Sequence, residues 1–286
     1  MGLEAQARQL SSTYPQLLIA ASRVAQSLMP GLHGRKRAGF GGDFWQFRPF
    51  SQGDNASRID WRKSARSDEI YLREREWSAP NRLMFWVDQG PSMNWKSNLA
   101  EVNKRDRANL LAMSLAILSA TAGEFTGLLD DEAKPRHSNH HLSHMAHRLE
   151  THQGHVLKNI KPPQGHACCI LFSDFLEPFA EMSQQLKNLS QMNHQIHLIE
   201  IADPAEESLP WQGHVQFQSL HQDARIEFSA VEDIRAAYSE ARTQHRAKLA
   251  DLARNLGLHH RLHRTDEAPN KILLSLYHEL SQRPGA

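Results

Sequence analysis

Apolar runs that close on an acidic residue recur from residue 83 onward, and they restrict the fold more than any other feature of the chain. The run LMFWVD covers residues 83–88 and ACCILFSD covers residues 167–174, each with its only acidic residue at the end. Short, continuously apolar runs of this kind are typical of parallel strands that are buried on both faces. EFTGLLD (124–130) and QIHLIEIAD (195–203) are further strand candidates. We therefore expect a buried, mostly parallel sheet.

Helical periods separate these strand candidates. Apolar residues recur at helical spacing over about 104–120, 179–189, 231–255 and 271–280. Strands that alternate with helices favour an α/β fold, here a three-layer sandwich with helices on both faces of a mostly parallel central sheet. The runs VQFQSL and ARIEFSA, joined by HQD, predict a hairpin, and LHHRLHR predicts a last short strand.

The chain divides at about residue 82. Residues 1–82 form an N-terminal elaboration: an amphipathic helix or two over 3–29, ended by Pro30 and Gly31, and then a β-rich segment that is dense in Arg and aromatic residues. Residues 83–286 carry the α/β pattern. A chain of 286 residues can bury a substantial core, and we expect the two parts to form one compact unit.

Composition argues against several locations and partners. The 33 basic and 32 acidic residues nearly cancel, which leaves no overall electrostatic attraction for nucleic acid or an anionic membrane. Cys168 and Cys169 are adjacent in a strand candidate and would point to opposite faces, so we expect no disulfide between them. The apolar stretch Leu17 to Ala25 is short and interrupted by Arg23, so we expect neither a signal peptide nor a membrane span. A cytoplasmic location is predicted.

Two of the acidic strand ends are candidate ligand-binding residues. Asp88 and Asp174 would lie at the C-terminal edge of the sheet, where open α/β sheets bind ligands. Two carboxylates near the Ser92 hydroxyl are hard oxygen ligands that suit Mg²⁺, Mn²⁺ or Ca²⁺. The alternative is that both carboxylates only cap helices and accept hydrogen bonds from backbone N–H groups.

The Arg-rich segment offers a candidate partner-binding surface. After the turn at Gln52-Gly53-Asp54 the chain reads RIDWRKSAR over residues 58–66, with Arg at every fourth position. Guanidinium groups form bidentate pairs with carboxylates and stack on indole rings, so this run can bind a partner or pin itself to the sheet. We select as partner-binding candidates Arg35, Lys36, Arg37, Arg58, Asp60, Trp61, Arg62 and Arg66.

The run over residues 53–66 resembles the hallmark of a bacterial family, domain of unknown function 58. SDFLEP (173–178), ADPAEESLP (202–210) and HRTD (263–266) also resemble segments of that family, in the same order. The resemblance implies a von Willebrand factor A-like domain in a non-enzymatic protein. It also implies a MoxR-type AAA+ ATPase as partner, in chaperone-like maturation or assembly of complexes with an unidentified client protein.

The same resemblance implies a metal-ion-dependent adhesion site. Its Asp-x-Ser-x-Ser loop would be residues 88–92, with Asp88 and Ser92 as ligands and Asp174 as the later Asp. Gly90 stands where the first Ser belongs, so one ligand oxygen is lost. The Thr of the site has no clear counterpart, since the loop around 134–139 offers only Ser138. The expected site is therefore degenerate, with Mg²⁺ or Mn²⁺ as its ion.

Two other functions remain open. Seven histidines lie between residues 137 and 155, and the pairs His140/His144 and His137/His141 have a spacing that chelates metal on a helix. With Asp88 and Asp174 they would indicate a metal-dependent hydrolase. The basic and aromatic residues of segment 31–77 could stack on bases, but acidic residues interrupt the segment and make nucleic acid an unlikely partner.

Overall fold

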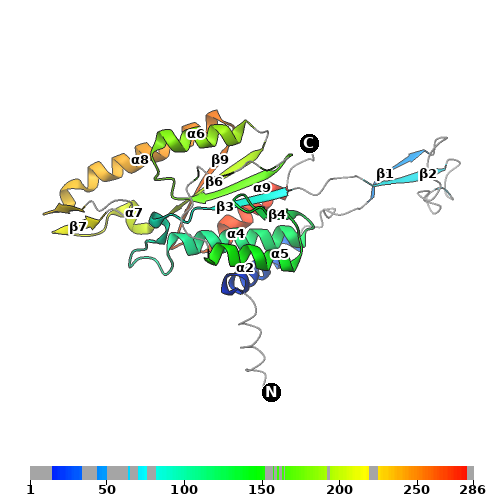
Figure 1. Ribbon diagram of the computed structural model, residues 1–286, viewed down its shortest axis with the longest axis horizontal. Helices are drawn as coiled ribbons and strands as arrows, with labels where there is room; N and C mark the ends of the chain where they lie inside the picture. Colours follow the sequence, from blue (N-terminus) through cyan, green and yellow to red (C-terminus); the bar gives the residue numbers. More distant parts are fainter. Residues whose placement is uncertain are drawn as a thin grey trace, which may run out of the picture.

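A five-stranded parallel sheet forms the centre of the molecule (Figure 1). The computed structural model describes residues 15–33, 44–49, 64, 70–75, 82–151, 157, 160, 163, 165–191, 194–218 and 225–281. The sheet has the strand order β4-β3-β5-β6-β9, and each of its pairings is parallel. Its strands are β3 (Arg82–Val87), β4 (Phe125–Leu128), β5 (Cys168–Ser173), β6 (Gln195–Ala202) and β9 (His259–Arg264).

The central strands are apolar throughout because they are buried on both faces. In β3, Phe85 and Val87 face one core, whereas Met84 and Trp86 face the other. Successive side chains of a strand point to opposite faces, so each core receives alternate residues. Cys169 is buried in the second of these cores, and Cys168 and Cys169 form no disulfide.

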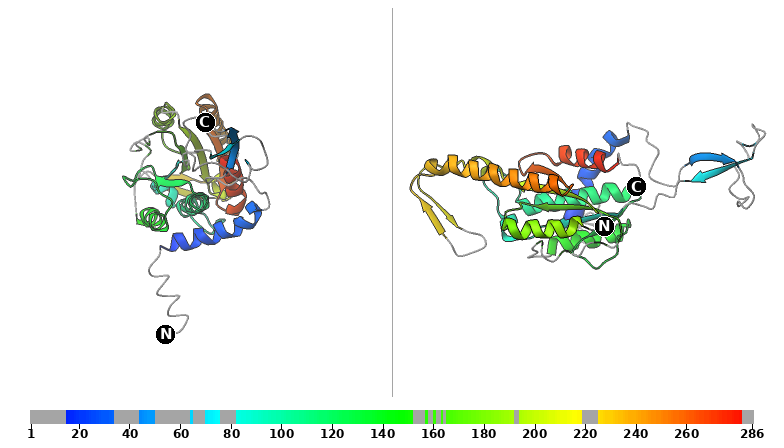
Figure 2. Two further views of the ribbon diagram at one scale, coloured as in Figure 1. Left: turned by 90° about the vertical axis from the view of Figure 1, so that its right-hand side faces the viewer. Right: turned by 90° about the horizontal axis from the view of Figure 1, so that it is seen from above.

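Helices cover both faces of the sheet and make a three-layer sandwich, which confirms the predicted fold class (Figure 1). One layer contains α4 (Lys104–Thr121), α5 (Asn139–Thr151) and α9 (Pro269–Ser281); the other contains α6 (Phe179–Ser190) and α8 (Glu232–Asn255). Helix α2 (Gln16–His33) packs on the outside of α4, and the left view of Figure 2 shows it (blue) at the edge of that layer. Because α2 covers its outer side, α4 is buried over most of its surface.

Helix α2 differs from the prediction at its C-terminal end. It continues through Pro30 to His33, although Pro30 was expected to end it. Proline removes one intrahelical hydrogen bond, which leaves the carbonyl of Gln26 without its usual donor. Both Gln26 and Pro30 are exposed, so water can reach this carbonyl and the helix can continue. Residues 3–14, the rest of the predicted helical region, lie outside the described residues.

Two short antiparallel ribbons are separate from the central sheet. β1 (Phe44–Pro49) pairs with β2 (Tyr71–Arg75), and β7 (Val215–Gln218) pairs with β8 (Arg225–Phe228) as predicted. A short helix, α7 (Pro204–Ser208), follows β6. None of the described helices combines the length and apolar character that a membrane span requires. The division of the chain at residue 82 stays a prediction.

The strand order places a topological switch point between β3 and β5. From β3 the chain moves first to β4 on one side and then to β5 on the other. The loops after β3 and β5 therefore leave the C-terminal edge of the sheet in opposite directions, and open α/β sheets bind ligands at such a position. Asp88 and Asp174 directly follow these two strands.

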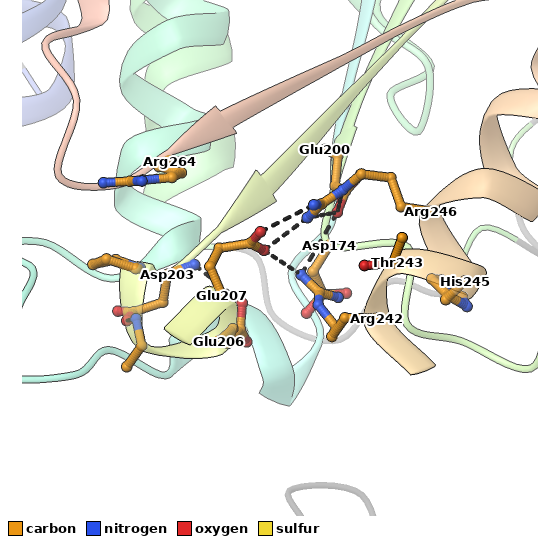
Figure 3. Close-up of polar contacts among 12 residues, drawn as sticks. Asp174, Glu200, Asp203, Glu206, Glu207, Arg242, Thr243, His245, Arg246 and Arg264 are labelled. Atoms are coloured by element: carbon orange, nitrogen blue, oxygen red, sulfur yellow. Dashed lines mark hydrogen bonds and ion pairs between the residues drawn. The ribbon is translucent and has the colours of Figure 1, made fainter. Parts of the chain in front are cut away.

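A buried ion cluster attaches α8 to the sheet (Figure 3). Glu200 of β6 is buried and accepts hydrogen bonds from Arg246 Nη2 at 2.9 Å and from His260 Nε2 at 3.0 Å. Glu207 accepts from the same Nη2 atom at 2.7 Å and from Arg242 Nη2 at 3.1 Å. Burial alone would raise the pKa of Glu200, but the His260 and Arg246 hydrogen bonds outweigh it and lower this pKa to about 2.

We predict that Glu200 makes folding stability fall in acid. Its pKa is below the ordinary 4.5, so its contribution is present above about pH 4.5 and is lost as the pH falls towards about 2. The contribution is on the order of 3 kcal/mol. Glu200→Gln should be less stable at pH 7, and denaturant unfolding should vary less for it between pH 5 and pH 3 than for the wild type. Glu240→Gln, at an exposed position of α8, is the control; equal pH dependence of Glu200→Gln and wild type would contradict the assignment.

Candidate functional site

Asp88 lies at the end of β3 and joins its loop to β5. It is buried, and its backbone N–H donates to the carbonyl of Phe172 at 2.9 Å. Asp88 Oδ1 accepts from the backbone N–H of Gly90 at 2.7 Å, and Oδ2 accepts from Ser173 Oγ at 2.6 Å. Both carboxylate oxygens therefore have donors, and neither donor is the N-terminus of a long helix. Asp88 therefore accepts a backbone hydrogen bond, as the alternative interpretation expected, and also a side-chain hydrogen bond from Ser173 of β5.

Asp174 follows β5 and is also buried. Its Oδ1 accepts from the backbone N–H of Leu176 at 3.2 Å, and its Oδ2 accepts from Lys104 Nζ at 2.9 Å. The next residue, Phe175, has φ 51°, a left-handed conformation that costs a bulky residue on the order of 1–3 kcal/mol. Its N–H donates to Ser173 Oγ at 3.0 Å and its carbonyl lies 2.8 Å from His245 Nε2 of α8. These contacts hold the strained turn in place.

The Lys104 ammonium is the positive charge of the site. Lys104 is the first residue of α4 and is buried, with Nζ hydrogen-bonded to both Asp174 and Glu206. The positive end of the helix dipole disfavours a cation at this position, so the two carboxylates must compensate for it. Burial acts to lower the pKa of Lys104, but Asp174 and Glu206 raise it above its ordinary value. The lysine is therefore charged.

Asp203 is a third acidic strand end that the sequence reasoning did not select. It follows β6, is buried, and accepts from Ser97 Oγ at 2.6 Å, Ser97 N at 2.8 Å and Ala205 N at 2.9 Å. With Glu206 it forms a capping box at the start of α7. The sequence signal was present, since an Asp at the strand end is followed by Pro204 and, three residues on, by Glu206.

The absence of a side chain at Gly90 leaves room for the Asp88 carboxylate. A Cβ at this position would lie 2.9 Å from Asp88 Oδ1, closer than real Cβ contacts come. A serine there would therefore force the Asp88 carboxylate to move. Ser92 lies two residues on, in the 3-10 turn η2 (Pro91–Asn94). Ser138 Oγ accepts from the N–H of His141 at 3.3 Å at the start of α5.

The site carries excess negative charge. Asp88, Asp174 and Glu206 contribute −3 when ionised and Lys104 contributes +1, which gives −2. Burial and the neighbouring Asp174 raise the pKa of Asp88 to about 6, against the lowering effect of its hydrogen bonds from Ser173 and Gly90. The Asp88 carboxyl at the switch point is therefore costly to ionise, and additional positive charge nearby would reduce that cost.

These side chains, as placed, do not fit an inner-sphere divalent ion. Mg²⁺ requires near-octahedral oxygen ligands, whereas Asp174 Oδ2 faces an ammonium, both Asp88 oxygens accept hydrogen bonds, and Gly90 supplies no oxygen. The predicted ligands Asp88 and Asp174 are nonetheless at adjacent strand ends, with Ser92 in the first of the two loops. Binding of Mg²⁺ or Mn²⁺ by Asp88, Ser92 and Asp174 stays a prediction, and it would require these side chains to rearrange.

The predicted partner-binding residues belong to a part of the chain that the structure does not describe. Arg35, Lys36, Arg37, Arg58, Asp60, Trp61, Arg62 and Arg66 all lie outside the described residues. Most of segment 31–77, the basis of the nucleic-acid alternative, lies outside them as well. Both predictions therefore stay predictions.

The described part of the His-rich segment does not form a metal cluster with Asp88 and Asp174. His141 is buried and its Nε2 lies 2.8 Å from the carbonyl of Thr126, while His137 stacks on Phe125. Within the described residues, the one group of three possible His, Cys, Asp or Glu ligands lies elsewhere, on β6, β9 and α9. The hydrolase alternative therefore gains no support from the described geometry.

The fold and the acidic switch point define the protein as an α/β sandwich with a buried, charged site at the C-terminal edge of its sheet. The chain belongs to the family described as protein of unknown function DUF58, which matches residues 46–248. Uncharacterized proteins of Mycobacterium bovis and Mycobacterium tuberculosis are 27% identical over 256 residues, covering 82% of this chain and 79% of theirs.

Two solved structures are more distantly similar. An aerotolerance-related membrane protein from Bacteroides fragilis has a TM-score of 0.44 and 13% identity, covering 71% of this chain and 100% of its own. The conserved hypothetical protein BatB from Bacteroides thetaiotaomicron has a TM-score of 0.41 and 11% identity, covering 71% of this chain and 98% of its own.

Removing the Lys104 ammonium should destabilise the fold. In Lys104→Met the buried Asp174 carboxylate loses its compensating charge, and breaking a buried ion pair costs about 3–5 kcal/mol. Urea unfolding at pH 7.5 should show this loss. Lys96→Met, at an exposed position of the preceding loop, should change stability by less than about 0.5 kcal/mol. A comparably small effect of Lys104→Met would show that the ion pair does not anchor α4.

Neutralising Asp88 should stabilise the protein. Its folded-state pKa of about 6 exceeds the ordinary 3.8, so ionising Asp88 costs stability as the pH rises between these values. In Asp88→Asn the amide oxygen can still accept from the Gly90 N–H, the amide NH₂ can donate to Ser173 Oγ in place of the present hydrogen bond, and the cost of the charge disappears. We expect a gain on the order of 2 to 3 kcal/mol at pH 8 that is absent at pH 4. Unfolding curves at both pH values measure it, and a loss of stability at pH 8 would contradict the prediction.

Proposed function

We propose that the protein is a non-enzymatic binding protein that works with a MoxR-type AAA+ ATPase in the maturation or assembly of protein complexes. The observation that carries the proposal is the Asp88 carboxyl, which is buried beside Asp174 at the switch point and has a pKa near 6. Stability alone would favour an asparagine there, and residues that cost stability are commonly retained for function. The ATPase as partner is implied by the family resemblance, as is the von Willebrand A-like character.

The surroundings of the site favour a protein partner. Leu99, in the loop between β3 and α4, is 48% exposed, and Leu176, two residues after Asp174, is 42% exposed. Protein interfaces commonly have an apolar core inside a polar rim, so these two leucines are candidate apolar contacts for a protein partner. In this proposal the loops after β3 and β5 make the docking surface, and their leucines supply its apolar contacts.

The same residues argue against nucleophilic catalysis. Ser173 donates to Asp88, as a serine nucleophile would donate to its base. However, Ser173 is buried and its Oγ also accepts from the Phe175 N–H, so the oxygen that would attack a substrate is already engaged. We therefore interpret the Ser173–Asp88 hydrogen bond as a structural contact that holds the loop after β3 against β5.

Docking can be tested by measuring binding of the full-length chain to the MoxR-type ATPase of the same organism, with and without ATP and Mg²⁺. Leu176→Ser removes an exposed contact without opening the core and should weaken binding about tenfold or more. Leu262→Ser, at a 37% exposed position of β9, is the matched control and should bind as the wild type does. Asp174→Asn should also weaken binding, provided that its circular dichroism shows a folded protein.

A binding measurement in EDTA without nucleotide distinguishes docking through the side chains alone from docking through a bound metal ion. Binding that persists in EDTA assigns docking to the side chains themselves. Binding that is lost in EDTA and restored by Mg²⁺ or Mn²⁺ assigns it to an ion held by Asp88, Ser92 and Asp174. If no association occurs under any condition, or if Leu176→Ser and Leu262→Ser behave alike, the proposed docking surface is wrong.

A further inference from the structure

Three possible metal ligands converge at the end of the sheet opposite to Asp88 and Asp174. His197 of β6, His259 of β9 and Glu279 of α9 each offer one ligand atom, and these atoms lie within 4.8 Å of one another. His259 is the first residue of β9 and is the register partner of His197, so the parallel pairing of two strands brings the imidazoles together. Glu279 reaches them from the last turns of α9.

The ligand set has the composition of a transition-metal site. Two imidazoles and one carboxylate suit Zn²⁺, and three protein ligands leave a fourth tetrahedral position for water or another ligand. His259 Nδ1 is already 3.0 Å from Glu279 Oε1. We propose that His197, His259 and Glu279 form a zinc site that ties the C-terminal helix to the β6–β9 edge of the sheet.

A second residue orients the carboxylate. Arg261, two residues along β9, donates to Glu279 Oε2 and leaves Oε1 directed at His259. Arg261 also contacts Ser275, which lies on the same helix as Glu279. Ligand carboxylates in metal sites are commonly held in this way by a hydrogen bond to the oxygen that does not bind the ion.

Metal binding requires one ring to move. The His197 and His259 rings are stacked, with centroids 4.6 Å apart and planes inclined by 13°. The lone pair of an imidazole nitrogen lies in the ring plane, so two parallel rings cannot direct both lone pairs at one ion. His197 is fully buried, whereas the His259 side chain is 44% exposed and has room to rotate out of the stack. The ligand atoms must also close to about 3.3 Å, the spacing set by Zn–N bonds of about 2.0 Å.

The proposal can be tested by zinc binding to the full-length chain, purified without a histidine tag and stripped with a chelator. We expect one Zn²⁺ per chain by calorimetry, and a visible absorption band of tetrahedral type when Co²⁺ replaces it. Melting temperature should rise by roughly 5 to 10 °C when free zinc exceeds the dissociation constant about 100-fold, because the ion binds only the folded chain.

Variants distinguish this site from adventitious binding by other histidines. Glu279→Gln keeps the shape of the side chain but removes its charge, and His259→Ala removes a half-exposed ring; each should weaken zinc binding about tenfold or more. The double variant His140→Ala/His144→Ala removes the exposed histidine pair of α5 and should bind zinc as the wild type does. The proposal is overturned if the wild type takes up no zinc, if the double variant loses it, or if Glu279→Gln keeps its affinity.

Discussion

The ion pair between Lys104 and Asp174 joins the start of α4 to the end of β5, and the other helices of one layer pack around α4. Helix α4 lies across one face of the sheet and has α2 packed on its outer side, with α5 and α9 in the same layer. Its first residue is tied to the end of β5 through Asp174 and to α7 through Glu206. A lysine at a helix N-terminus is unfavourable by itself, so the carboxylates at the sheet edge determine where this layer begins.

The short helix α7 connects the two helical layers around the end of the sheet. Its neighbouring glutamates point to different networks: Glu206 binds Lys104 of α4, and Glu207 binds Arg242 and Arg246 of α8. Through Arg246 the second network reaches Glu200 inside β6, as Figure 3 shows. Charged residues that are individually costly to bury therefore form two groups: Glu200 and Glu207 pair with Arg242 and Arg246, whereas Asp174 and Glu206 share the single cation Lys104.

The sequence predicted the sheet well and the site only in part. Continuous apolar runs identified β3, β5 and β6 because a strand buried on both faces leaves no room for polar side chains, and the same runs placed Asp88 and Asp174 at adjacent strand ends. Lys104 and Glu206 were missed because their pairing joins residues about a hundred positions apart and no local spacing indicates it. Pro30 was misinterpreted because its effect depends on which side of α2 faces water.

The raised pKa of Asp88 also links the site to protons. A carboxyl with a pKa of about 6 exchanges its proton with solvent close to neutral pH, unlike an ordinary aspartate. In the proposed docking mode, a partner group that prefers the ionised carboxylate would compete with that proton and release it on binding. Binding of the proposed partner at the sheet edge would then depend on pH through this one side chain, which lies between β3 and β5.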